Sequence, residues 1–203
     1  RDNRINRIWE GTNEINKMLC GRAMIQKTLT GELGFREYLE KVNSYCSEGL
    51  DSGYEGDMKD EVECVEAAKA IYALSLNEAL SKFGQDIGTE QMIMQNLANI
   101  LIYCYVADST LSRVMQNKEL YEKTKQDVPE LCAKVYTAEE GLRVVEYVNK
   151  IFNSIFDGDI PTDMKKKLEL LSSRLTMSTN TIGLKKLIGE KVVESGGYPV
   201  KSF

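Results

Sequence analysis

The sequence contains no histidine, and this absence narrows the chemistry that the chain can perform. Catalytic Ser–His and Cys–His arrangements need an imidazole, and so do the commonest zinc sites. An acid or a base in this chain must therefore be Asp, Glu, Lys, Tyr or Cys. The five cysteines are odd in number and form no CxxC pair, so we expect reduced thiols and neither a disulfide framework nor a metal site.

The chain also lacks a methionine at its start, a signal sequence and a long apolar run. Its first residue is Arg1, so we expect a piece of a longer protein. The most apolar run, Leu97 to Ala107, is far shorter than the roughly 20 residues that a membrane span requires. The net charge of -5 argues against nucleic acid as a partner. We expect a protein without membrane association, in the cytoplasm or, in a eukaryote, the mitochondrial matrix.

Helical periodicity is the dominant pattern of the sequence. Its 203 residues are 42% hydrophobic with only three prolines, enough for a sizeable core. No strand pattern of alternating residues bounded by turns is present. We predict an all-α fold, an antiparallel helical bundle, with the helix opened by Thr89 as the longest and Asp60 as a helix cap. The predicted helices cover about residues 13–30, 35–46, 60–83, 89–117, 129–156, 162–175 and 182–194.

The first predicted helix carries a charge within an apolar stripe. Arg22 has helical spacing with the stripe, where a charge needs a partner or a ligand phosphate. Alternatively, the Arg22 side chain extends to the surface. The apolar members of the stripe are Ile15, Met18, Ile25 and Leu29.

A short acidic motif precedes this helix. Taken alone, Glu10 is a solvated acid near a helix start, and Thr12 is an N-cap. The whole segment, however, resembles the C-terminal signature of acyl-CoA dehydrogenases over about its first thirty residues. The matching positions are Arg1-Asp2, Ile5, Ile8, the aromatic Trp9, Glu10-Gly11-Thr12, Glu14-Ile15 and Arg22. Trp9 departs from the more usual Tyr or Phe, and Glu14 from the Gln of several members.

This resemblance implies a role for each residue of the motif. Glu10 would be the catalytic base that takes the α-proton of a fatty acyl thioester, while the β-hydrogen leaves as hydride to FAD. Thr12 and Glu14 would contact the FAD, and Arg22 the coenzyme A. Gly11 would bind substrate, because a residue without a Cβ lets the backbone pass close to a ligand.

The resemblance also implies how the chain is organised. Residues 1–33 would end the catalytic helical domain. Residues 34–203 would form an extension that resembles, in length, position and helicity, the extra domain of very-long-chain acyl-CoA dehydrogenases. The FAD pocket would be incomplete in this chain, so we expect it to be inactive alone.

The partners implied for the complete enzyme are fatty acyl-CoA, electron-transfer flavoprotein as electron acceptor and further copies in a homo-oligomer. The alternative is a non-catalytic helical module for assembly or surface docking.

Overall fold

The structure of the chain, a computed structural model, describes residue 5, residue 9 and residues 11–200. Within this part it contains eight α-helices and no strand, as the all-α prediction requires. The helices are α1 (Asn13–Leu29), α2 (Phe35–Glu48), α3 (Lys59–Phe83), α4 (Gln91–Gln116), α5 (Lys118–Thr124), α6 (Val128–Ile155), α7 (Thr162–Leu175) and α8 (Thr181–Glu194), with a 3-10 helix, η2 (Gly84–Thr89), between α3 and α4.

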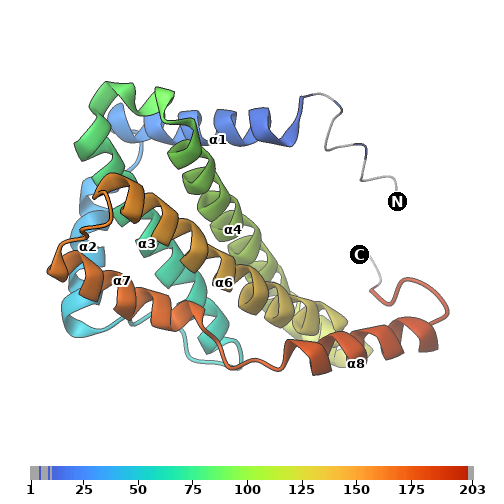
Figure 1. Cartoon of the computed structure of the whole chain (residues 1–203). Helices are drawn as coiled ribbons and strands as arrows, with labels where there is room; N and C mark the ends of the chain where they lie inside the picture. The colour runs from blue at the N-terminus through green and yellow to red at the C-terminus, as the bar shows by residue number, and fades with distance from the viewer. Residues whose placement is uncertain (1–4, 6–8, 10, 201–203) are drawn as a thin grey trace.

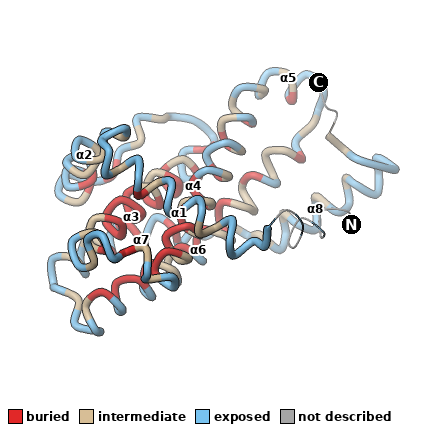
Figure 2. Tube along the Cα trace, turned by 90° about the horizontal axis from the view of Figure 1, so that it is seen from above, coloured by how far each residue is buried: buried red, intermediate tan, exposed pale blue. Residues whose placement is uncertain are grey.

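Three long helices, α3, α4 and α6, form the centre of the bundle (Figure 1). Consecutive long helices run in opposite directions, so the antiparallel bundle is confirmed. The red segments of Figure 2 mark the buried core, which contains Ile71 of α3, Leu97 of α4 and Phe152 of α6. The shorter helices pack around this centre: α1 on α4, α2 and α7 on α3, and α8 on α6.

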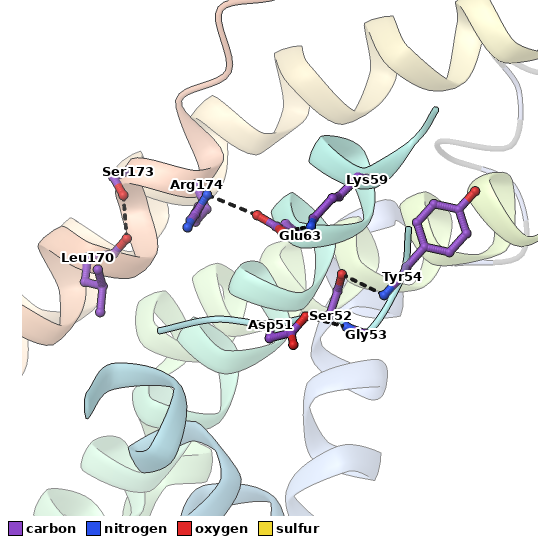
Figure 3. A network of polar contacts seen from close by, with 9 residues as sticks. All are labelled: Asp51, Ser52, Gly53, Tyr54, Lys59, Glu63, Leu170, Ser173 and Arg174. Atoms are coloured by element: carbon purple, nitrogen blue, oxygen red, sulfur yellow. Dashed lines mark hydrogen bonds and ion pairs between the residues drawn. The ribbon is translucent and has the colours of Figure 1, made fainter. Parts of the chain in front are cut away.

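A buried carboxylate links α7 to α3. Glu63 of α3 lies 3.0 Å from Arg174 of α7 and 4.0 Å from Lys59 (Figure 3). Because Glu63 is almost fully buried, it needs these cations to offset the loss of hydration. The ion pair thus fixes the start of α3 against the end of α7.

The loop before α3 is held by a side-chain hydrogen bond: Asp51 accepts from the Gly53 amide at 2.8 Å.

Several predicted details of the helices were wrong. At 28 residues, α6 is longer than α4, which has 26. Asp60 is not a cap, since α3 begins at Lys59 and burial of the preceding Met58 in the core fixes the entry to the helix. Thr89 does not open α4, because it ends η2 and its hydroxyl donates to the Asp86 carbonyl at 2.7 Å. The short helix α5 was not predicted at all.

The buried apolar side chains connect the helices of the bundle. One hydrophobic cluster runs from Ile25 of α1 to Leu175 of α7. Within residues 11–200, no helix combines the length and the apolar character needed to cross a bilayer.

Gly141 of α6 lies in close contact with α3 and with the end of α7. A Cβ at Gly141 would lie 3.2 Å from the Cys64 sulfur and 3.4 Å from the Leu175 carbonyl oxygen. Gly141→Val should therefore lower the free energy of unfolding by about 1–3 kcal/mol, the usual cost of overpacking a core. Urea unfolding measures this change.

Gly189 of α8 is the matched control, because a Cβ there meets no atom within 4 Å. Gly189→Val should change the stability by less than about 0.5 kcal/mol, as surface substitutions usually do. Equal effects of the two substitutions would contradict the close packing at Gly141.

Candidate active site

The helix that follows the acidic motif, α1, has two apolar faces. Residues three or four apart share one face of a helix, so Met18, Gly21 and Ile25 lie together. Gly21 and Ile25 are buried against the bundle, and Met18 packs partly against it. The predicted stripe was wrong for Ile15 and Leu29, which are 57% and 64% exposed. They lie on a second, exposed face, which flanks the first one and includes Leu19.

Arg22 lies on this second face and not among the buried residues. It is exposed, and it follows the exposed Leu19 by three residues and precedes Leu29 by seven. Among the described residues, no carboxylate lies within ion-pair distance of Arg22. Of the two alternatives for Arg22, the structure therefore agrees with the exposed one, in which its side chain extends to the surface.

The acidic turn stands just before α1. Glu10 lies outside the described residues, so its position and contacts are not described. Its neighbours Trp9 and Gly11 are exposed. Gly11 has a φ of 98°, a backbone conformation that side chains with a Cβ rarely adopt. The turn therefore requires glycine at this position for its backbone shape alone.

Asn16 closes the turn, and sequence reasoning missed this residue. Its side-chain amide donates to the Gly11 carbonyl at 3.3 Å, and its backbone amide donates to the Thr12 carbonyl at 3.0 Å. The signal in the sequence for this contact was a polar residue five positions after a glycine. Asn16 thereby joins the turn to the first turn of α1.

Thr12 occupies the N-cap of α1 in an extended conformation, with φ of -62° and ψ of 153°. Its position as the cap residue was predicted correctly, but its side chain makes no capping hydrogen bond. The hydroxyl is therefore not used by the helix. Glu14 lies in the first turn, where the partial positive charge of the helix N-terminus stabilises a carboxylate.

The whole segment from Gly11 to Asn16 is exposed. In Figure 2, the N-terminal half of α1 is pale blue where it leaves the red core. The described residues thus hold the turn at the end of a helix without enclosing it. A site that excludes water here needs walls from outside this part of the chain.

Strongly perturbed titratable groups occur elsewhere, in the core. The Tyr103 hydroxyl lies 3.3 Å from the Cys64 sulfur and 3.2 Å from the Thr137 carbonyl oxygen. Burial raises the pKa of Cys64 to about 11 and that of Cys104 to about 12. Both thiols are consequently protonated at neutral pH, which makes them poor nucleophiles. All five cysteines are free.

An apolar groove of about 410 Å³ lies at the other end of α1, between helices α1 to α4. Its lining includes Met24, Tyr38 and Tyr105. The charged residues in the lining, Lys69 and Asp108, pair with each other at 2.9 Å. Met24 lies about three helical turns from the start of α1, so the groove is separate from the acidic turn.

Comparison with known proteins identifies the bundle. The family profile for the C-terminal domain of acyl-CoA dehydrogenases matches residues 67–170, about half of the chain. A curated relative, the "Probable acyl-CoA dehydrogenase" of Bacillus subtilis (strain 168), is 30% identical over 206 residues, covering 98% of this chain and 34% of the relative. The chain belongs to the acyl-CoA dehydrogenase family.

A solved structure agrees with this assignment. The crystal structure of an acyl-CoA dehydrogenase complexed with FAD from Bacillus anthracis is 25% identical, with a TM-score of 0.82. The match covers 98% of this chain and 33% of that one. The chain therefore spans about a third of the length of these relatives. The profile lies within α3 to α7, and the proposed domain boundary between residues 33 and 34 stays a prediction.

The unused hydroxyl of Thr12 gives a second prediction. Thr12→Ala should leave amide exchange in the first turn of α1 nearly unchanged, because no capping bond is lost. Asn180→Ala is the control, since the Asn180 side chain accepts from the Gly183 amide at 3.0 Å and caps α8. Losing that cap should cost about 1 kcal/mol, or about fivefold faster exchange at the start of α8. Faster exchange in the Thr12 variant would show a cap there.

Proposed function

We propose that the complete protein is an FAD-dependent dehydrogenase that oxidises a fatty acyl-CoA to its α,β-unsaturated product. Glu10 takes the α-proton as base, and the β-hydrogen leaves with its electron pair as hydride to the flavin. The observation that carries this proposal is the sequence Glu10-Gly11-Thr12, whose described residues Gly11 and Thr12 lie at the exposed start of α1, in a chain of the acyl-CoA dehydrogenase family. A relative with this helical domain is an FAD complex.

The local structure suits a base at this position. A carboxylate on a short side chain, held by a turn, approaches a carbon acid in a more defined geometry than a flexible lysine does. The nearby N-terminus of α1 favours the charged carboxylate, whereas burial beside an acyl chain would disfavour it. The Glu10 backbone amide is placed by this proposal as a donor to the thioester carbonyl, where enolate-like charge develops.

The residues beside the turn fit a bound FAD. The hydroxyl of Thr12 makes no capping bond and can donate to a cofactor oxygen. Glu14 is exposed on the first turn of the same helix and can accept from a cofactor hydroxyl. FAD supplies the hydride acceptor when bound. Because the described residues leave this segment exposed, we assign the remaining walls of the FAD pocket to the part of the protein beyond this chain, and we expect the chain alone to be inactive.

The exposed face of α1 fits the same proposal. Ile15, Leu19 and Leu29 are all more than half exposed, which is unusual for three large apolar side chains on one helix face. In the complete enzyme this face would pack against the missing part. The same observation supports the second candidate, a non-catalytic assembly or docking module. Electron-transfer flavoprotein and a homo-oligomer remain our proposed partners.

The role of Glu10 gives a third prediction, for the complete protein. Glu10→Gln should retain FAD and acyl-CoA binding but slow flavin reduction by about 10²-fold or more, the scale of losing a positioned base. Stopped-flow absorbance of the flavin measures this rate. Glu32→Gln, an exposed acid beyond the end of α1, is the control and should reduce its flavin normally. Normal reduction in the Glu10 variant would assign the base elsewhere. A wild type whose flavin is not reduced by acyl-CoA would instead favour the docking module.

The exposed position of Arg22 gives a fourth prediction. We propose that Arg22 contacts the phosphates of coenzyme A, because it is an exposed cation on α1. Arg22→Ala should raise KM for acyl-CoA by about tenfold with little change in kcat, as the loss of a charged hydrogen bond remote from the reacting atoms does. Arg36→Ala, which removes another exposed arginine, should leave KM unchanged. Equal KM values for both variants would remove Arg22 from the substrate site.

A further inference from the structure

The acidic turn is carried by a helix whose main contact with the bundle is a single crossing. Helix α1 packs chiefly on α4, and its N-terminal half extends past that helix (Figure 1). Gly21 lies at the crossing: a Cβ there would be 3.2 Å from the Met94 terminal carbon, 3.5 Å from the Met94 carbonyl oxygen and 3.9 Å from the Ala98 Cβ. The absence of a side chain at residue 21 therefore allows the backbones of α1 and α4 to approach each other this closely.

The α4 side of this crossing is held firmly. Met94 and Ala98 are both fully buried, and α4 is packed against α3 and α6. A larger side chain at Gly21 would therefore displace α1 more readily than α4. The Met94 terminal carbon is the flexible end of its side chain and can yield to one added methyl group, whereas a longer side chain at residue 21 would meet more of the Met94 side chain.

A displacement at the crossing is magnified at the turn. α1 begins at Asn13, eight residues before Gly21, which is about 12 Å of helix at 1.5 Å per residue. A tilt of about 10° at Gly21 would move the start of α1 by roughly 2 Å over that length. An error of about 1 Å in the position of a reacting group can slow catalysis by about 10²-fold.

We propose that Gly21 is a positioning residue: its close contact with Met94 and Ala98 sets the direction of α1 and thereby the place of the Glu10 turn. This inference rests on the proposed function, since it concerns where the base of that reaction stands. It assigns a role to the helical bundle, which supports the turn through α4.

The test is a size series at one position in the complete protein. Gly21→Ala, Gly21→Val and Gly21→Leu should lower kcat per bound flavin progressively, with about a 10²-fold loss for leucine, while KM stays close to wild type. Flavin affinity should also fall, because Thr12 and Glu14 lie on the helix start that moves. Adding Met94→Ala to Gly21→Leu should restore most of kcat, because it removes the side chain that the leucine meets. A merely structural Gly21 would instead lower thermal stability and leave kcat per bound flavin unchanged, and that result would overturn the proposal.

A second readout does not depend on activity. Crystal structures of wild type and Gly21→Leu, superposed on α3, α4 and α6, should show the start of α1 displaced by roughly 2 Å, which corresponds to a tilt of about 10° over eight residues. An unmoved α1 would overturn the positioning role. If the wild type oxidised no acyl-CoA while α1 moved as expected, the proposed function would fail and the positioning of the turn would stand.

Discussion

The antiparallel packing of α3, α4 and α6 is the constraint on which the other helices depend. Large side chains such as Leu97, Ile100 and Phe152 are fully excluded from water within it. Each contributes about 1.5–3 kcal/mol by its burial, against the entropy of ordering the chain. α4 connects this centre to α1, because it packs on α3 and α6 while its Met94 and Ala98 lie against Gly21 of α1. A stable α4 is therefore the condition for placing α1 at all.

This arrangement separates stability from chemistry in space. Burial strongly raises the pKa values of Cys64, Cys104 and Tyr103, which lie inside the bundle. The described motif residues Gly11, Thr12 and Glu14 lie at the exposed start of α1, beyond that core. This division is expected of a chain that spans about a third of the length of its relatives. A pocket whose walls come from two parts of a protein is open when only one part is present.

Helical periodicity was sufficient to predict the long helices and the bundle, since each buries a continuous apolar stripe. Periodicity could not separate the two faces of α1, because Ile15 and Ile25 are equally apolar and only the position of α4 decides which is buried. Nor could it show that Thr12 leaves its hydroxyl free or that Asn16 closes the turn, since both depend on side-chain rotamers. The motif itself was readable from the sequence because its residues are contiguous, whereas the contact of Gly21 with Met94 joins positions far apart in the chain.

The central claim is that the Glu10 turn, held by α1 on α4, presents a base to the α-carbon of an acyl thioester. The most direct measurement is a crystal structure of the complete protein with FAD and an acyl-CoA analogue that carries sulfur in place of the β-carbon, from which no hydride can leave. Our account predicts a Glu10 carboxylate oxygen about 3–3.5 Å from the α-carbon, the separation of a reactive pair. A different carboxylate at that distance, with Glu10 turned to solvent, would contradict it.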